Sequence, residues 1–284
     1  AFISEERLDR IKDSRAFPDH AVAACLAELG VEDVAQVDLV VMDYIRDGTD
    51  WRRDEYKTPA RRDVFLADLP QDRVHIINHH LCHAAATFHA SGFDRAAVLV
   101  VDGRGSNQET QSLFRAGPDG IELLESTDCI GIGLLYATVT QAIGFGLLQE
   151  GKTMGLAPYG AGMAGWIFDF QGRFDGIVTD YGAVCKEGVY EFKTPHGAVD
   201  SFEQLAQCAH EVQVDCERAL MHFASHSMSE TVLLHLCFSL CLCLYSVSYH
   251  LILRSALFED IFINPACSDT GLPLGAAPYG YPLS

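Results

Sequence analysis

The sequence lacks a cluster of basic residues. Its 20 lysines and arginines stand against 39 aspartates and glutamates, which gives a formal net charge of −19 at pH 7. An acidic chain repels the phosphate backbone of a nucleic acid, so this balance argues against nucleic-acid binding. Small anions remain compatible with it, because backbone N–H groups and metal ions hold them locally against a negative field.

A C-x-x-C pair and a secretory leader are also missing. None of the ten cysteines is spaced as in a zinc ribbon or a thioredoxin-type motif. The first segment, AFISEERLDRIKDSRAF, is charged from residue 5 onward and has no apolar region of the secretory kind. We therefore expect reduced thiols in the core of a cytoplasmic protein.

One run lacks charge altogether. Residues 231–253, TVLLHLCFSLCLCLYSVSYHLIL, are 23 residues without Asp, Glu, Lys or Arg, which is long enough to span a bilayer. His235, His250 and several serines interrupt the run, and on an insertion scale they disfavour a membrane span. The alternative for this run is an exposed apolar patch that docks a partner chain.

Apolar runs and glycine turns alternate along the chain. Residues 37–43, 73–78 and 96–106 are typical of buried strands, and the last two enclose a predicted helix at 81–92. The other predicted elements are a helix at 18–31, a hairpin at 110–127, a helix at 131–145, a glycine-rich loop at 148–160, one or two amphipathic helices at 201–230, and a strand, loop and helix at 260–280. This alternation predicts an α/β fold with sites at the carboxyl ends of its strands.

Histidines concentrate in the segment INHHLCHAAATFHASGF. His79 and His83 are spaced i, i+4, which on a helix puts both imidazoles on one face, close enough to share a metal ion. His80 lies about 100° away around such a helix and cannot join them. A histidine pair on an alanine-rich helix is often merely structural, so the pair alone is weak evidence for a metal.

Two carboxylates strengthen the metal hypothesis. Asp102 ends the apolar strand AAVLVVDG and is followed by Gly103 and Gly105, while Asp269 and Gly271 lie in a second turn from strand to helix. A carboxylate in such a turn is well placed for a metal or a phosphate, although turn aspartates are also common without a ligand. Two histidines and two carboxylates form a mixed N/O set that suits Fe(II), Mn(II) or Zn(II).

The segment QEGKTMGLAPYG is a third candidate for ligand binding. Its glycines would let the backbone approach a ligand, and Lys152 would meet a phosphate as a point charge. The competing interpretation is a surface loop in which Glu150 and Lys152 form an ion pair.

Four motifs in fixed order resemble one protein family. They are NHHLCHAAATF, VVDGRGS, EGKTMGLAPYG and FINPACSDTGLPLGAAPYG. Together they look like the O-carbamoyltransferases of the nodulation-factor and tobramycin type. That family is similar to the hydrogenase-maturation carbamoyltransferases and to the tRNA threonylcarbamoyl-transfer proteins. The resemblance covers nearly the whole chain, from residue 4 onward.

The resemblance implies a fold, a cofactor and a reaction. The fold would be actin-like/sugar-kinase-like (ASKHA), one transfer domain over 1–284 with two similar halves, 1–128 and 129–284, around a cleft. Fe(II) or a similar divalent ion would contact the phosphate of carbamoyl-adenylate. The carbamoyl group would pass to a hydroxyl of a small-molecule acceptor. We also expect the chain to be cytoplasmic, with a homodimer as its possible assembly.

The same resemblance implies roles for particular residues. The metal ligands would be His79, His83, Asp102 and Asp269. The proton of the acceptor hydroxyl would go to a base, for which His80 and the acids of residues 169–180 are candidates. Nucleotide-facing positions would be Gly103, Gly105, Glu150, Lys152 and Gly271, because backbone amides of glycine loops steady developing charge.

The chain also departs from the family pattern. The resemblance implies an N-terminal strand hairpin and a C-terminal adenylate-forming domain that are not present here. Paired glycines and an asparagine of the family are replaced by Leu240, Cys241 and Tyr245. Side chains at the glycine positions would crowd a nucleotide. A truncated or degenerate relative without turnover, serving as a binding or assembly module, is therefore the alternative hypothesis.

Overall fold

The computed structural model describes residues 1–12, 14, 16–44, 69–146, 148–163, 173–182, 185–186, 189–192, 201–240 and 246–281. The described strands are β1 (Val40–Tyr44), β2 (Val74–Asn78), β3 (Ala96–Val101), β4 (Gln111–Gly117), β5 (Gly120–Thr127), β6 (Arg173–Asp175), β7 (Val178–Asp180), β8 (Cys185–Lys186), β9 (Val189–Phe192), β10 (His235–Leu240) and β11 (Asp260–Ile263).

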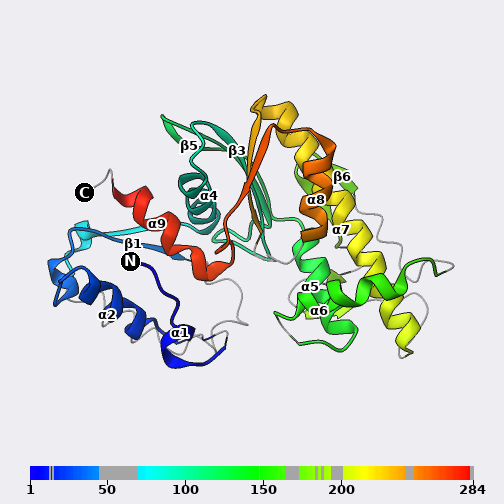
Figure 1. Ribbon diagram of the computed structural model, residues 1–284, viewed down its shortest axis with the longest axis horizontal. Helices are drawn as coiled ribbons and strands as arrows, with labels where there is room; N and C mark the ends of the chain where they lie inside the picture. Colours follow the sequence, from blue (N-terminus) through cyan, green and yellow to red (C-terminus); the bar gives the residue numbers. More distant parts are fainter. Residues whose placement is uncertain are drawn as a thin grey trace.

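The described α-helices are α1 (Glu6–Asp9), α2 (Asp19–Glu28), α4 (His79–Ser91), α5 (Ile132–Ala142), α6 (Glu150–Leu156), α7 (Phe202–Thr231), α8 (Ser246–Ser255) and α9 (Pro273–Gly280). Short 3₁₀ turns are η1 (Val34–Gln36), η3 (Gln71–Arg73), η4 (Ala157–Gly160) and η5 (Asp269–Gly271). The prediction of a mixed α/β fold is confirmed (Figure 1).

A five-stranded sheet forms the centre of the molecule, in the order β11-β10-β3-β4-β5. β11, β10 and β3 are parallel, and β4 and β5 continue the sheet as the predicted antiparallel hairpin. The sheet joins strands from before and after residue 129. β1 and β2 pair in parallel as a separate small sheet.

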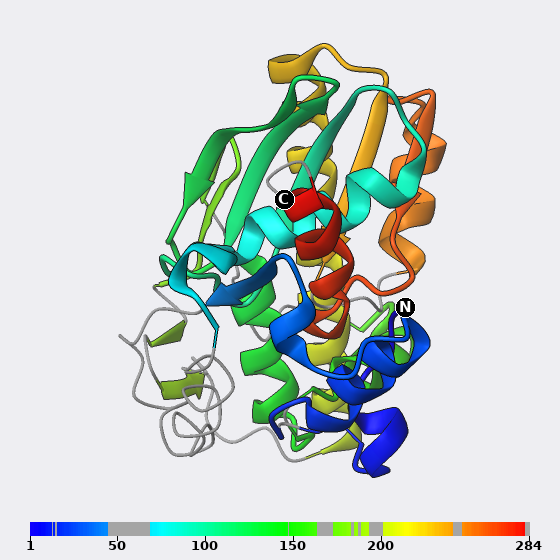
Figure 2. The same cartoon turned by 90° about the vertical axis from the view of Figure 1, so that its left-hand side faces the viewer.

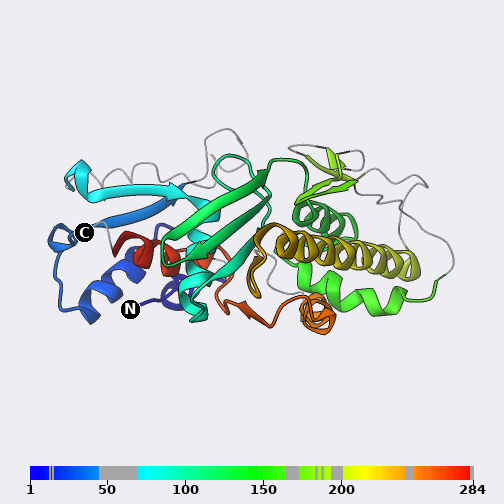
Figure 3. The ribbon, with the colours of Figure 1, turned by 90° about the horizontal axis from the view of Figure 1, so that it is seen from above.

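The central strand β3 is buried on both faces, which explains its continuous apolar sequence. Leu99 and Val101 face a core built with α5, α7 and α8, while Val98 and Val100 face a second core that includes residues of α4. Figure 2 looks onto α9 and α4, and Figure 3 shows α7 on the other side of the sheet from α9. The sheet is thus covered by helices on both faces.

Glycine sets the contact between α4 and α9. A Cβ atom at Gly275 would lie 2.0 Å from the carbonyl oxygen of Cys82 and 2.5 Å from the nitrogen of Ala86. The two helices therefore approach closely only because position 275 has no side chain. Leu272 and Ala276 fill the adjoining apolar contact with Cys82.

The glycine-rich segment 148–160 corrects one expectation. It was expected to be a loop, but residues 150–156 form α6 and 157–160 form η4. Tertiary packing overrides the poor helix propensity of its glycines: Thr153 is buried and bonds the hydroxyl of Thr140 on α5 at 2.8 Å.

The uncharged run divides into separate elements. Residue 231 ends the single long helix α7 (Phe202–Thr231), residues 235–240 form β10 inside the sheet, and residues 246–255 form α8. Among the helices that the structure describes, none combines the length and apolar character that a bilayer crossing requires.

Replacing Gly275 tests the close helix contact. We expect Gly275→Ala to destabilise the fold by about 1–3 kcal/mol, because overpacking a buried contact forces the backbones apart. Gly155→Ala in α6 is the matched control, since its added Cβ would meet no atom within 4 Å. The control should be neutral or slightly stabilising. Urea unfolding followed by circular dichroism measures both; equal stability of Gly275→Ala and the parent would contradict the contact.

Cysteine labelling tests the placement of the core. Burial raises the thiol pKa of Cys208 and of Cys237 to about 12, whereas Cys25 and Cys129 are only partly buried. Because the thiolate is the reactive form, we expect iodoacetamide at pH 8 to label Cys25 and Cys129 before Cys208 and Cys237. Peptide mapping by mass spectrometry gives the order, and rapid labelling of Cys208 in native protein would contradict the described core.

Candidate functional site

The carboxyl ends of β1, β2 and β3 supply the first part of the site. Asp43 is the second-last residue of β1 and pairs with Ile77 of β2, and β2 leads directly into α4 at His79. Asp102 follows the last residue of β3. Three strand ends thus bring two carboxylates and an imidazole to one place.

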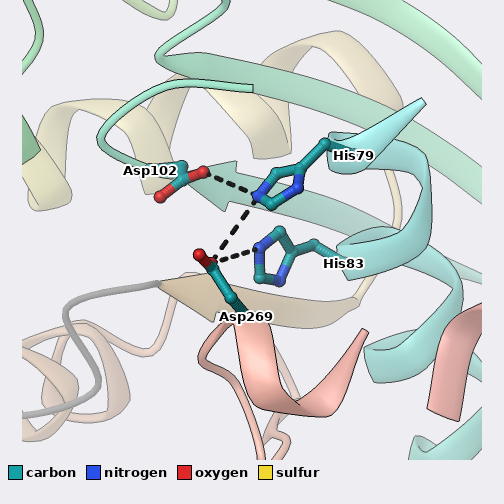
Figure 4. A group of neighbouring side chains, drawn as sticks. All are labelled: His79, His83, Asp102 and Asp269. Atoms are coloured by element: carbon teal, nitrogen blue, oxygen red, sulfur yellow. Dashed lines mark hydrogen bonds and ion pairs between the residues drawn. The ribbon is translucent and has the colours of Figure 1, made fainter. Parts of the chain in front are cut away.

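Four predicted residues come together there, as Figure 4 shows. Nε2 of His79 is 3.1 Å from Oδ2 of Asp102 and 3.7 Å from Oδ1 of Asp269, and Nε2 of His83 is also 3.7 Å from that Asp269 oxygen. The four ligand atoms all lie within 4.8 Å of one another. Three of the residues are buried, while the side chain of Asp269 is 48% exposed. The cluster is therefore reached from the Asp269 side.

Each histidine of the pair is oriented through Nδ1, the ring nitrogen that does not face the cluster. Nδ1 of His79 is 2.8 Å from Oδ2 of Asp43, and since a carboxylate only accepts, Nδ1–H is the donor. Nδ1 of His83 is 3.2 Å from the hydroxyl of Ser239 on β10. Both rings therefore present Nε2 to the centre of the cluster, which is how outer partners orient metal-binding histidines.

The turn after β3 holds the start of α4. The hydroxyl of Ser106 accepts a hydrogen bond from the backbone N–H of His79 at 2.8 Å, and Oδ1 of Asn78 caps the N–H of Leu81 at 3.0 Å. Glu109 accepts from the amide of Asn78 and from the N–H of Asn107, both at 2.5 Å. These bonds fix the helix start, and with it the ring of His79.

The electrostatics of the cluster favour positive charge. Burial opposes ionisation of Asp102, but the hydrogen bond and the charge of His79 outweigh it and hold the pKa of Asp102 well below its usual range. Burial likewise opposes protonation of His79, yet hydrogen bonds to Asp102 and Asp43 raise its pKa well above the usual value. Asp102 at Nε2 and Asp43 at Nδ1 thus both stabilise a positive charge on the His79 ring.

The donor set fits a divalent ion. Nε2 of His83 is buried and has no hydrogen-bond partner among the described residues, although buried imidazole nitrogens ordinarily have one. Ligand atoms at about 2.0–2.2 Å from one ion lie roughly 3–3.6 Å apart, close to the separations here. Two imidazoles and two carboxylates suit Zn(II), Fe(II) or Mn(II).

His80 lies behind this cluster, on the sheet side. Its Nδ1 bonds the hydroxyl of Ser112 on β4 at 2.7 Å, and its Nε2 is 3.9 Å from Oδ2 of Asp102. The ring is fully buried, its Nε2 has no hydrogen-bond partner among the described residues, and burial lowers its pKa to about 3. As expected from the helix period, it does not join the His79–His83 face.

The three predicted nucleotide-facing glycines differ in their surroundings. A Cβ at Gly103 would meet no atom within 4 Å, so room for a ligand exists there. A Cβ at Gly105 would lie 2.8 Å from side-chain atoms of His80 and Glu109, and one at Gly271 would lie 1.7 Å from the carbonyl oxygen of Ala266. At Gly105 and Gly271, the absence of a side chain therefore allows neighbouring segments of the chain to pack closely.

Glu150 and Lys152 are on α6, which packs against α5, α7 and η4. Lys152 donates to Oε1 of Gln149 at 2.8 Å and lies over the ring of Phe145. Glu150 is buried, and burial raises its pKa. The contacts described for Glu150 and Lys152 are therefore made around α6, and none of them is with the four-residue cluster.

Sequence reasoning missed the residues that orient the cluster. Asp43 ends a predicted strand, which is the signal that identified Asp102, so the same rule would have found it. Ser239, Ser106 and Glu109 gave no such signal. Cys241 and Tyr245 lie outside the described residues, and so does the side chain of Leu240.

Comparison with known proteins gives one family-model match and several relatives. A model described as "Carbamoyltransferase N-terminus" matches residues 62–278. Nodulation protein NolNO of Sinorhizobium fredii is 25% identical over 98% of this chain and 44% of its own length. Nodulation protein NolO of Bradyrhizobium diazoefficiens is 26% identical over 71% of this chain and 37% of its own. The chain thus spans less than half the length of these two curated relatives.

Solved structures share the fold at low sequence identity. Full-length HypF in its phosphate- and nucleotide-bound form is 11% identical, with a TM-score of 0.55, and covers 95% of this chain and 51% of its own. HypF of T. kodakarensis is 14% identical, with a TM-score of 0.51, and covers 92% of this chain and 42% of its own. These likenesses concern the fold alone.

The orienting role of Asp43 can be tested by metal titration. We expect Asp43→Ala to weaken divalent-ion binding by about 10- to 100-fold, because the ring of His79 loses its outer partner. Asp43→Asn should recover part of that affinity, since its amide oxygen still accepts from Nδ1–H. Asp38→Ala, just before β1 and exposed, is the matched control. Calorimetric titration with Mn(II) measures all three; unchanged affinity in Asp43→Ala would contradict the role.

Proposed function

The chain belongs to the carbamoyltransferase N-terminal family, and from this premise we propose that it transfers a carbamoyl group from carbamoyl-adenylate to a hydroxyl of a small-molecule acceptor. The observation that carries the proposal is the cluster of His79, His83, Asp102 and Asp269. Contacts at Nδ1 orient both histidines so that Nε2 faces the centre of the cluster. The relatives NolNO and NolO are nodulation proteins, and the hydroxyl acceptor is proposed from the sequence resemblance.

The proposal includes a divalent ion, Fe(II) or a similar metal, held by these four residues. When bound, it would act as a Lewis acid on a phosphate oxygen of the donor. Asp43 and Ser239 would fix the two imidazoles, and the exposed Asp269 would form the wall on the solvent side. The buried Asp102 would keep the negative charge that retains the cation.

The transfer step is an acyl substitution. The acceptor hydroxyl oxygen forms a bond to the carbamoyl carbon, the bond from that carbon to the phosphate oxygen breaks, and AMP leaves with the electron pair. The hydroxyl proton goes to a base. His80 was the candidate from the sequence, but its ring is fully buried and burial lowers its pKa to about 3, so the proposal leaves this role open between His80 and the acids of residues 169–180. Gly103 would leave room for the donor.

The proposal covers the transfer step only. Because the chain spans less than half of NolNO and NolO, formation of carbamoyl-adenylate is assigned to no residue described here. The actin-like/sugar-kinase-like class, the cytoplasmic location and the homodimer remain predictions of the sequence. The replacements at Leu240 and Cys241 favour one competing proposal, a domain that keeps the metal but has lost nucleotide binding.

A carbamoyl-transfer assay with metal analysis tests the proposal. We expect the parent chain, loaded with Fe(II), to convert synthetic carbamoyl-adenylate and a hydroxyl acceptor into AMP and a carbamate ester. His79→Ala/His83→Ala should lose the bound metal and at least about a hundredfold in rate, because Lewis-acid stabilisation is worth several kcal/mol. Mass spectrometry of the products and elemental analysis of the protein are the measurements.

The exposed His89, on the same helix, provides the control. His89→Ala should keep both metal and activity, because it lies outside the cluster. If the double variant keeps its metal, the ligand assignment is wrong. If the parent holds the metal but neither binds AMP nor releases it from the donor, the degenerate-domain alternative replaces the proposed function.

A further inference from the structure

A second group of potential metal ligands lies away from the site just described. Glu125 of β5 and His226 and Glu230 of α7 each offer one ligand atom, and the three atoms lie within 4.8 Å of one another. Nε2 of His226 is 2.7 Å from Oε1 of Glu125. The proposed carbamoyl transfer uses none of the three residues.

A β-bulge turns Glu125 toward α7. In the β4–β5 pairing, Leu113 is opposite Glu125 and Phe114 is opposite Leu123, so Leu124 is an extra residue in β5. Without this bulge, Glu125 would point to the same face as Leu123, the face of Phe114. With it, Glu125 shares the face of Leu113, which packs in the core that α7 helps to build. Re-aiming a side chain in this way is a recurrent use of bulges.

α7 brings the other two ligands to the same point. His226 and Glu230 are spaced i, i+4, so their side chains project from one face of the helix, one turn apart. The side chain of His226 is only 19% exposed, so its ring is held close to β5. An imidazole and a carboxylate on one helix turn, completed by a carboxylate from a neighbouring strand, resemble the ligand spacing of many metal sites.

The turn between β6 and β7 closes the group from a third direction. A Cβ at Gly176 would lie 3.1 Å from Oε2 of Glu125 and 3.3 Å from Nε2 of His226, so the backbone there comes close to both. Nε2 of His222, one helix turn before His226, bonds the carbonyl oxygen of Gly176 at 2.9 Å. Figure 1 shows β6 beside the C-terminal half of α7.

We propose that Glu125, His226 and Glu230 bind a divalent transition-metal ion, with Zn(II) as the best match. One imidazole and two carboxylates suit Zn(II) better than Ca²⁺ or Mg²⁺, which prefer all-oxygen sites. Ligand atoms of one zinc ion lie roughly 3–3.6 Å apart, so the His226–Glu125 pair would open only slightly from 2.7 Å. The ion ties β5 to α7 and stabilises the fold rather than taking part in transfer.

Zinc titration of the whole chain, first stripped with EDTA, tests this site. The parent should bind two Zn(II) ions, one in the cluster around His79 and one here, and His226→Ala should bind one. Zinc should raise the melting temperature of the parent more than that of His226→Ala, because an ion that binds only the folded state stabilises it. Ca²⁺ and Mg²⁺ should produce no such difference.

Matched variants separate the site from general effects. His210→Ala on the same helix and Glu122→Gln on the same strand lie outside the group and should bind zinc as the parent does. Glu125→Gln and Glu230→Gln should each weaken the second ion by at least about tenfold, since even outer-shell losses cost that much. In His79→Ala/His83→Ala, one ion should remain.

The proposal is overturned if His226→Ala and Glu230→Gln bind as much zinc as the parent, or if His79→Ala/His83→Ala binds none while still folded. Either result would make the group an ion pair only. A loss of carbamoyl transfer in His79→Ala/His83→Ala with the second ion still bound would support both sites, so the two proposals fail independently.

Discussion

Asp102 is a carboxylate buried at the centre of the molecule, and much of the surrounding structure keeps it charged. A buried carboxylate without partners is strongly destabilising, because it loses its hydration and gains nothing in return. Here it accepts a hydrogen bond from the N–H of Gly103 at 2.6 Å and lies 3.1 Å from Nε2 of His79. His79 is in turn held by Asp43 and by Ser106. One charge therefore constrains the end of β3, the start of α4 and the end of β1 together.

Two glycines allow helices to pack closely around the site of Asp102. A Cβ at Gly133 would lie 2.7 Å from the carbonyl oxygen of Asp102, so α5 begins directly against the end of β3. Gly275 plays the same part where α9 packs on α4, and η5, with Asp269 as its first residue, immediately precedes α9. The cluster is thus built largely on helices and strand ends that pack against one another, the arrangement that holds ligands most rigidly.

The sequence predicts the parts of this arrangement that repeat along the chain. Apolar runs located β1, β2 and β3, the i, i+4 spacing placed His79 and His83 on one face, and strand-to-turn aspartates gave Asp102 and Asp269. The sequence does not predict hydrogen-bond partners that come together only through tertiary packing. Ser239 approaches His83 from 156 residues away, and Glu109 holds Asn78 across a turn that no periodicity encodes. Segment 148–160 was predicted as a loop for a related reason: its glycines favour a loop locally, and packing against α5 and α7 decides for a helix.

The proposed function makes two separate demands on the segment around residue 240, where the sequence resemblance leads us to expect paired glycines. Ser239, which orients His83, precedes Leu240 in β10, and its neighbours in the sheet pair in regular register with β3. The contact that orients His83 is therefore formed within a strand of regular register, independently of the residues that follow it. The expected nucleotide contact concerns Leu240 and Cys241, where the sequence resemblance predicts glycines and this sequence has larger residues. Under the proposed function, metal binding and nucleotide binding therefore depend on different residues of one short segment, and a loss of nucleotide binding need not remove the metal.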